Sequence, residues 1–259
     1  TFNYFKSQDV AIKVISGDNP QTVSQIAVQA GIENAQHYID ASLLDSDKKI
    51  AEAANNYTVF GRVTPKQKQL LVKALQASGH TVAMTGDGVN DAPALKSADI
   101  GIAMGSGTEV AKDASAMVLV DDNFASIIDA VEIGRTVYSN IKKSITYLFS
   151  GNLGAIISIL FAVFADWSNP YTALQLIFIN MVNDSLPAIA LGMENPEEGI
   201  MSLAPRSKDE GLLGGGTWQA ILSRGTFVGL AAIMAQYIGM QQSAELGVAL
   251  AFTTLLLSR

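Results

Sequence analysis

The sequence contains no cysteine, which excludes disulfide bonds, cysteine-ligated zinc and thiol catalysis. Basic residues are also few, since 17 Lys and Arg stand against 24 Asp and Glu, so no basic surface for nucleic acid is expected. Charge of either sign becomes rare in the second half. Residues 1–143 hold 13 basic and 16 acidic side chains, whereas residues 144–259 hold only 4 and 8. The first half is therefore typical of a soluble domain and the second of a membrane region.

The sequence also lacks a signal peptide, and it begins at Thr1 rather than at methionine. It ends at Arg259, directly after an apolar run. We therefore expect a segment of a longer polypeptide, cut at both ends.

Short apolar strands alternate with helices through the first half. The sequence predicts strands at 10–15, 57–62, 81–85, 100–104 and 117–120, and helices at 21–30, 65–75, 90–96 and 109–113. This alternation favours a parallel sheet with helices on both faces. Ligands of such sheets bind at the carboxyl ends of the strands, where the sequence places Ser16-Gly17-Asp18 and Gly86-Asp87-Gly88.

Four apolar segments in the second half are candidates for membrane spans. They cover about 144–165, 171–193, 219–240 and 244–259, and Ile145–Ala165 contains no formal charge. About 20 apolar residues suffice to cross the hydrocarbon layer of a bilayer, which is roughly 30 Å thick. Basic residues precede the first segment and follow the second. The positive-inside rule therefore predicts a multi-pass protein with residues 1–143 in the cytoplasm.

No proline or cluster of turn residues interrupts the chain between Phe124 and Ala165. This predicts one helix of about 42 residues, about 60 Å long at 1.5 Å per residue. The alternative is two helices with a break near Gly134 or Gly151. The sequence thus divides into a partial α/β domain at 1–123, a helical stalk at 124–143 and a transmembrane domain at 144–259.

The segment Thr85–Lys96, with the sequence TGDGVNDAPALK, carries the first candidate site. Asp87 follows a predicted strand between two glycines, so its carboxylate can reach a metal ion or a phosphate with the backbone close by. Asn90 and Asp91 begin the next helix, where backbone N–H groups favour anions. Hard oxygen ligands beside an anion site indicate Mg²⁺ with a phosphate. For a bare Gly-Asp-Gly, the alternative is a turn followed by an aspartate helix cap.

This segment closely resembles the hinge motif of P-type ATPases, which are ion pumps with a haloacid-dehalogenase-like phosphorylation domain. Ser16-Gly17-Asp18 resembles the TGD motif of that family, with serine keeping the hydroxyl group of threonine. The segment Arg62–Lys68 resembles the one whose last lysine contacts the phosphoryl group, and residues 97–122 also follow the family. The resemblance covers essentially the whole chain. It implies a haloacid-dehalogenase-like, Rossmann-like α/β cytoplasmic domain followed by an α-helical transmembrane bundle.

The resemblance also implies roles for individual residues. Asp87 is expected to bind Mg²⁺, and Lys68 to neutralise charge on the transferring phosphoryl group. Arg62 and Lys68 are expected to contact ATP. By itself, a lysine such as Lys68 is equally compatible with a solvated position on a helix.

The remaining motif residues are expected to support the phosphoryl group. Ser16 and Gly17 resemble donors of hydrogen bonds to it, and Asp18 completes their motif. Asn90 and Asp91 resemble the residues that position the phosphate and Lys68.

The second candidate site lies in the membrane region. Asp184 interrupts an apolar segment, where a charged side chain costs at least about 2.5–3.5 kcal/mol and is by default functional. Asn180, Asn183 and Asp184 follow at i, i+3 and i+4, which places them on one face of an α-helix. Pro187 has no N–H group, so the carbonyl of Asn183 is freed at the same level. These oxygens predict a site for a hard cation, with hydrogen-bonded packing between helices as the alternative.

This cluster resembles the sixth membrane helix of calcium-type pumps, and Asn152 resembles an asparagine of the fifth. Two departures affect the expected number of ions. Ala155 stands where pumps that carry two calcium ions have an acidic residue, and Arg259 falls where a further acidic ligand is found. Loss of a carboxylate and gain of a guanidinium argue against a complete second cation site.

The resemblance therefore implies a bacterial-type pump that exports a cation across the plasma membrane through an aspartyl-phosphate intermediate. One Ca²⁺ per cycle is the favoured cargo, with Mn²⁺ or a monovalent cation as alternatives. A phosphatase of the same superfamily on a passive membrane anchor is the alternative from another class. Mg²⁺ and ATP are the implied cofactors. The phosphorylated aspartate, the nucleotide-binding and actuator domains and the first four membrane helices are expected elsewhere in the polypeptide, so these 259 residues alone are expected to be inactive.

Overall fold

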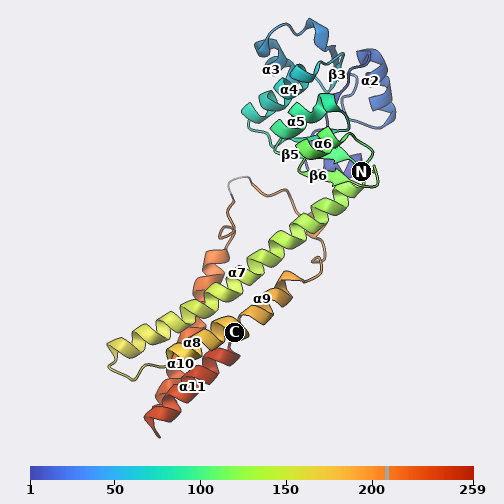
Figure 1. Ribbon diagram of the computed structural model, residues 1–259. Helices are drawn as coiled ribbons and strands as arrows, with labels where there is room; N and C mark the ends of the chain where they lie inside the picture. The colour runs from blue at the N-terminus through green and yellow to red at the C-terminus, as the bar shows by residue number, and fades with distance from the viewer. Residues whose placement is uncertain (208–209) are drawn as a thin grey trace. The chain divides into compact units, whose positions relative to one another are not determined.

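The computed structural model describes residues 1–207 and 210–259. The described residues divide into two compact units, Thr1–Ala130 and Val131–Arg259 (Figure 1). All the strands that the structure describes belong to the first unit, and the second unit is built of helices and loops.

The first unit is an α/β domain in which several helices begin where the sequence predicts them. Thr64 and Gln67 form a capping box at one helix start, with Pro65 in the first turn, and the side chain of Asn19 caps another. The elements in chain order are α1 (Phe2–Ser7), β1 (Val14–Ile15), α2 (Pro20–Gln29), β2 (Tyr38–Asp40), α3 (Asp47–Asn56), β3 (Val59–Gly61), α4 (Pro65–Ala77), β4 (Ala83–Gly86), α5 (Ala92–Ser97), β5 (Ile100–Met104), α6 (Glu109–Ala114) and β6 (Met117–Leu119).

The strands form two parallel three-stranded sheets, whereas the sequence predicted one sheet. Their orders are β1-β3-β2 and β4-β5-β6. β1 pairs with β3 and β4 pairs with β5, and the second edge of each has no partner strand within the described chain. The alternation of strands and helices predicts parallel pairing, but it does not specify which strands are neighbours. Within the described residues the predicted sheet is divided in two, whereas the predicted parallel pairing is confirmed.

Helix α4 contributes to the hydrophobic cores of both sheets. Leu71 is buried with Phe60 of β3, and the next residue, Val72, is buried with Met84 of β4. On its flanks α4 packs against α3 and α5. Because one helix serves both cores, its position relative to both sheets is fixed by packing. The same helix carries Lys68.

The sequence does not predict α1, β2 and α3. β2 has only three residues, and α3 buries only Ile50, Ala53 and Ala54. α1 and β2 are too short to give a periodic signal. The sequence does contain a signal for α3, because its three buried residues stand at i, i+3 and i+4 and the side chain of Ser46 caps it.

Helix α7 (Ser126–Phe164) runs for 39 residues without interruption. The predicted single long helix is therefore confirmed. The alternative break at Gly134 or Gly151 does not occur, since both residues lie within continuous helix.

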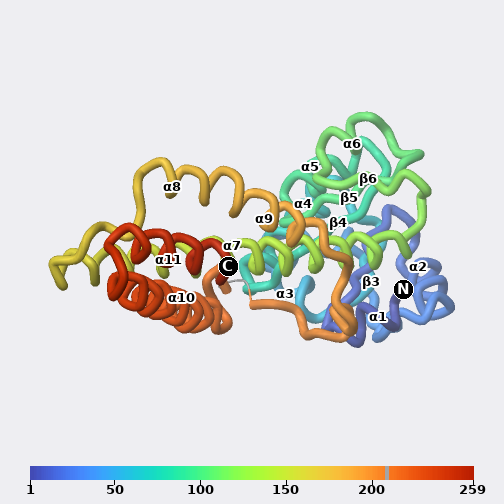
Figure 2. The backbone as a smooth tube through the Cα atoms, turned by 90° about the horizontal axis from the view of Figure 1, so that it is seen from below, coloured from blue at the N-terminus to red at the C-terminus, as the bar shows by residue number. Residues whose placement is uncertain are grey.

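The remaining helices are α8 (Ala173–Phe178), a π-helical turn (Ile179–Asn183), α9 (Ser185–Gly192), α10 (Thr217–Met240) and α11 (Ala244–Leu257). Helices α10 and α11 form a hairpin and lie side by side (Figure 2). Among the described residues, three helical stretches are long and apolar enough to cross a membrane: Ser126–Phe164, Ala173–Gly192 and Thr217–Met240. The fourth predicted span appears as the shorter apolar helix α11.

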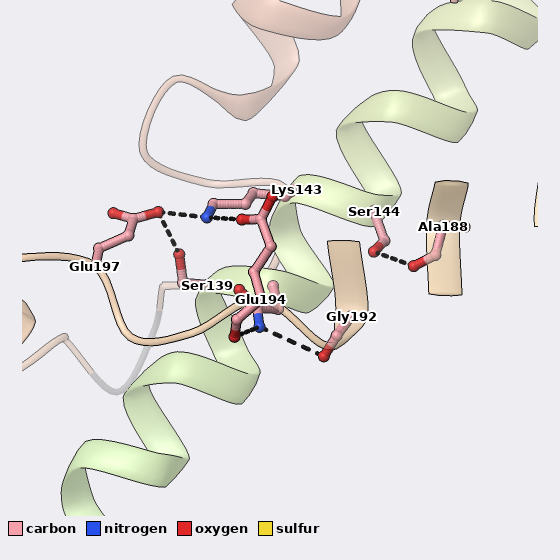
Figure 3. A network of polar contacts seen from close by, with 8 residues as sticks. Ser139, Lys143, Ser144, Ala188, Gly192, Glu194 and Glu197 are labelled. Atoms are coloured by element: carbon pink, nitrogen blue, oxygen red, sulfur yellow. Dashed lines mark hydrogen bonds and ion pairs between the residues drawn. The ribbon is translucent and has the colours of Figure 1, made fainter. Parts of the chain in front are cut away.

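A polar network fastens the loop after α9 to one section of α7 (Figure 3). The Lys143 ammonium forms ion pairs with Glu194 at 2.5 Å and with Glu197 at 2.7 Å. The Ser139 hydroxyl donates to Glu197 at 3.3 Å. The Asn140 amide, which is buried, donates to the carbonyl of Glu194 at 2.8 Å. Several side chains of α7 therefore share the task of holding one loop.

Replacing Lys143 by methionine should release this loop. The hydrogen bond from Lys143 lowers the pKa of Glu197 below its ordinary value of 4.5. The stabilisation of the loop by this carboxylate is therefore complete above pH 4.5, and it is lost as the pH falls through the lowered pKa. Limited proteolysis between residues 194 and 207 should be faster in Lys143→Met at pH 7 and unchanged in Lys143→Arg. Equal cleavage rates in all three proteins would contradict this role.

Candidate functional site

The first site is organised by an ion pair between α4 and the residue that precedes α5. Lys68 Nζ lies 2.6 Å from Asp91 Oδ1, and the two side chains are only 14% and 10% exposed. The other oxygen, Oδ2 of Asp91, accepts a hydrogen bond from the backbone N–H of Gly88 at 3.2 Å. The pair is thus held on both sides, which fixes the ammonium of Lys68 next to the turn that follows β4.

Asp87 lies in that turn, directly after β4. Its side chain is exposed, and its carboxylate has no hydrogen-bond or ion-pair partner among the described residues. The Asn90 side chain is likewise exposed. Both therefore offer oxygen atoms that the fold itself does not use.

The donor set around Asp87 fits Mg²⁺. No group of three or more His, Asp or Glu side chains capable of holding a metal ion occurs among the residues that the structure describes. Mg²⁺ is commonly held by one or two carboxylates, with water and substrate phosphate completing the octahedron. A free carboxylate at Asp87, with the amide oxygen of Asn90 in the following turn, meets that requirement.

The Ser16-Gly17-Asp18 turn follows β1 and is tied to the end of β3. The N–H of Ser16 donates to the Phe60 carbonyl at 2.9 Å, and the Asp18 carbonyl accepts from the N–H of Arg62 at 2.8 Å. The Ser16 hydroxyl donates a hydrogen bond to Asp18 Oδ2 at 3.1 Å. It also accepts one from the backbone N–H of Asp18, again at 3.1 Å. Gly17 and Asp18 are exposed and Ser16 is half-buried, so the turn presents its tip to solvent.

Arg62 has a left-handed backbone, with φ of 52°, which is uncommon for a residue other than glycine. Its guanidinium, 55% exposed on the side chain, pairs with Asp40 at 2.7 Å. Hydrogen bonds from Ser42, followed by the charge of Arg62, hold the pKa of Asp40 below its usual value. Asp40 was not predicted from the sequence, because it lies 22 residues from Arg62 and no local motif connects them.

The second site centres on Asp184, which follows the π-helical turn and is 2% exposed. Its Oδ2 forms an ion pair with the guanidinium of Arg259, and both side chains are 3% exposed. Asp184 Oδ1 and Arg259 Nε are buried without a hydrogen-bond partner among the described residues. The guanidinium also lies against Gly151, where an added Cβ would come within 2.7 Å of its Cζ.

The two asparagines lie in different surroundings from Asp184. Asn180 is exposed and Asn183 is half-buried, and the turn that contains them is π-helical rather than α-helical. A π turn contains more residues than an α turn, so the spacing no longer gives the shared α-helical face that was predicted. The Asn183 carbonyl accepts from the Tyr147 hydroxyl at 3.3 Å, so the oxygen freed by Pro187 already has a donor.

Asn152 and Ala155, which both belong to α7, also lie in different surroundings. Asn152 is exposed, and no hydrogen bond links it to Asp184 or Arg259 in the described chain. Ala155 is 6% exposed and belongs to an apolar cluster with Tyr171, Ile179, Ala251 and Leu255. Apolar packing thus surrounds the position where a second acidic ligand would be required.

Two family models match this chain. Residues 1–99 match haloacid dehalogenase-like hydrolases, and residues 168–259 match the C-terminus of cation transporting ATPases. Together with the parallel α/β domain and the apolar helices, these matches indicate a part of a P-type ATPase.

Relatives extend the similarity over almost the whole chain. It is 55% identical to a calcium-transporting ATPase of Listeria monocytogenes over 98% of this chain and 29% of that protein. Calcium-transporting ATPase 1 of Lactococcus lactis is 54% identical over the same shares, 98% and 29%. A calcium-transporting ATPase of Bacillus subtilis is 42% identical over 95% of this chain and 28% of that protein. The chain therefore belongs to the P-type cation ATPases, and it spans less than a third of the length of these relatives.

Among solved structures, the catalytic domain of the CPx-ATPase CopB-B is similar over 48% of this chain and 39% of its own chain. The identity is 25% and the TM-score is 0.37.

Removing Lys68 should destabilise the first unit, because it leaves the buried carboxylate of Asp91 without its counter-charge. Breaking such a pair typically costs about 3–5 kcal/mol. Lys68→Met should therefore speed hydrogen exchange in α4, β4 and α5, whereas Lys66→Met, at an exposed position, should not. Indistinguishable exchange in the two variants would show that the pair does not stabilise this region.

Proposed function

We propose that this chain is part of a pump that uses ATP to export one divalent cation, Ca²⁺, across the plasma membrane through an aspartyl-phosphate intermediate. The observation that carries the proposal is the Lys68–Asp91 ion pair beside the free carboxylate of Asp87. The same chain buries Asp184 among apolar helices. A phosphoryl-transfer site and an intramembrane carboxylate in one polypeptide suit a pump better than a phosphatase with a passive anchor.

At the first site, this chain would supply positioning and charge. The ammonium of Lys68, held by Asp91, would lie against the oxygens of the transferring phosphoryl group. The N–H of Gly17 would donate to the same oxygens, and so would the hydroxyl of Ser16 after it turns away from the Asp18 carboxylate. Mg²⁺, held by Asp87 and Asn90, would neutralise the phosphoryl charge when bound.

The acceptor aspartate is expected from another part of the polypeptide. Two observations support this. Among the described residues, β1 and β4 each keep one unpaired edge, and the proposed phosphoryl ligands follow the carboxyl ends of these two strands. A parallel strand seated against both edges would end beside Ser16, Asp87 and Lys68, which is where a carboxylate must lie to accept the γ-phosphoryl group of ATP.

At the second site, Asp184 would bind the transported ion, and oxygens of Asn180 and Asn183 would join it after a change of the π-helical turn that now separates them from its face. Ca²⁺ takes six to eight oxygen ligands, so other helices must complete the shell. The relatives named calcium-transporting ATPases support Ca²⁺ as the ion. Two observations support one ion: Ala155 is packed in an apolar cluster, and Arg259 places a positive charge beside Asp184. The guanidinium adds positive charge where a second cation would lie, and it occupies only Oδ2 of Asp184, so that Oδ1, which has no hydrogen-bond partner among the described residues, is the oxygen left for the one ion.

Asp87→Asn in the full-length protein should abolish phosphoenzyme formation at ordinary Mg²⁺ while leaving the fold intact. The carboxylate is exposed and has no partner in the described chain, so its loss removes a metal ligand but no structural contact. Acid-stable ³²P labelling from ATP is the measurement. Asp113→Asn, also at an exposed position, is the control and should label normally. Normal labelling of Asp87→Asn would remove Asp87 from the metal site.

Asp184→Asn should eliminate ion-dependent phosphorylation, because Asp184 is the only carboxylate of this chain that is proposed to bind the transported ion. If there were two ion sites, the substitution would instead leave about half of the bound ion. Equilibrium ⁴⁵Ca binding should give one tightly bound ion per phosphorylation site in the unaltered protein. Ala155→Glu alone should not add a second ion while Arg259 remains.

Asp166→Asn, in the turn after α7, is the matched control for this change and should bind Ca²⁺ normally. Asp166 has φ of 57°, a conformation that asparagine tolerates. Two tightly bound ions per phosphorylation site in the unaltered protein would contradict the one-ion proposal.

A further inference from the structure

The Asp87 side chain is placed by its backbone alone. It is exposed, and nothing in the described chain donates a hydrogen bond or an ion pair to its carboxylate. Asp91, four residues later, is different, because Lys68 and the Gly88 N–H hold both of its oxygens. Whatever fixes the peptide of Asp87 therefore decides the direction of its Cα–Cβ bond, and with it the region that its carboxylate can reach.

The segment 105–108, here called the support loop, contacts that peptide directly. The backbone N–H of Thr108 donates to the carbonyl of Asp87 at 2.8 Å. Gly107 lies so close that an added Cβ would be 3.0 Å from the Asp87 carbonyl oxygen and 3.1 Å from its Cα. The same Cβ would be 2.9 Å from the carbonyl oxygen of Met104. All three neighbours are backbone atoms, so none of them can turn aside as a side-chain end would.

The other end of the support loop is anchored as well. Gly105 N–H donates to the Leu119 carbonyl at 2.8 Å, and Ser106 N–H donates to Asp122 Oδ1 at 2.9 Å. That hydrogen bond holds the pKa of Asp122 below its usual value, so its carboxylate is charged at neutral pH. The support loop is therefore fixed against the end of β6 on one side and against Asp87 on the other.

We infer that the support loop positions the proposed Mg²⁺ ligand: the N–H of Thr108 and the close approach permitted by Gly107 set the direction of the Asp87 carboxylate. This inference rests on the proposed role of Asp87. Gly107 and Thr108 touch neither the metal ion nor the phosphate in this arrangement. They are positioning residues, and they act through the backbone of Asp87.

The inference is tested by adding one methyl group. Gly107→Ala in the full-length protein should push the Asp87 peptide away and raise the Mg²⁺ concentration for half-maximal phosphoenzyme formation by about 10-fold or more, as substitutions behind a metal ligand commonly do. The maximum level should return at high Mg²⁺. Ser106→Ala is the matched control, because Ser106 is exposed, its backbone N–H is kept, and the hydroxyl that it loses bonds to Asp122 and not to Asp87. It should leave the Mg²⁺ dependence unchanged.

A second pair of variants keeps the test valid if Gly107→Ala does not fold. Thr108 has φ of −65°, the value that proline adopts, so Thr108→Pro removes the N–H donor without a change of φ. The Thr108 hydroxyl also caps α6, and Thr108→Ala removes that cap while keeping the N–H. The shift in Mg²⁺ dependence should therefore appear in Thr108→Pro and be absent from Thr108→Ala.

Direct metal binding provides a readout that does not depend on turnover. Mn²⁺ bound to the full-length protein is followed by EPR, and the fraction lost in Asp87→Asn defines the ion held by Asp87. Gly107→Ala should weaken binding of that fraction about 10-fold or more.

The outcomes separate this inference from the function on which it rests. If Asp87→Asn removes no Mn²⁺, the proposed metal site fails. If Asp87→Asn removes it but Gly107→Ala and Thr108→Pro bind Mn²⁺ as the unaltered protein does, the site stands and the positioning role is overturned. A lower maximum with an unshifted Mg²⁺ midpoint would also overturn it, because it indicates general loss of folded protein.

Discussion

The ion pair between Lys68 and Asp91 is the contact on which the arrangement of the first unit depends. It joins α4, whose residues enter the cores of both sheets, to the turn that follows β4. Because Asp91 is buried and satisfied on both oxygens, the negative charge near the turn that remains available is that of Asp87. Two aspartates four residues apart thus have opposite surroundings. One is committed to the structure, and the other is left free for a ligand.

Asp87 lies in one turn and is contacted by the support loop, and the sequence predicted only the turn. The segment Thr85–Lys96 predicted the turn, and the helices predicted from residues 21 and 65 begin within one residue of those positions. The contacts of Asp87 with the support loop could not be predicted, because a backbone N–H meeting a backbone carbonyl is independent of side-chain type. A glycine such as Gly107 indicates that some close approach occurs, but not which residue approaches.

In the membrane region the same division appears. An aspartate within an apolar segment indicated a functional site, and Asp184 is indeed buried. The helical periodicity used to place Asn180 and Asn183 assumed an α-helix, and the π-helical turn changes that spacing. The partner Arg259 lies 75 residues away, and a resemblance in one position, rather than a local pattern, directed attention to it. The sequence therefore indicated that Asp184 matters, and the fold determined that its partner is Arg259.

The edges of β1 and β4 that have no partner strand in the described part of the chain also affect how this segment behaves outside its polypeptide. Each edge presents a row of backbone N–H and C=O groups that can pair with any extended chain. Natural proteins protect such edges with charged residues, proline or a covering segment, whereas Ala83 and Met84 of β4 and Val14 and Ile15 of β1 are all uncharged. Residues 1–130 expressed by themselves would thus expose two templates for strand addition, and self-association through these edges would compete with the monomeric state. A peptide with the sequence of the natural neighbouring strand would suppress that association by occupying the edges first.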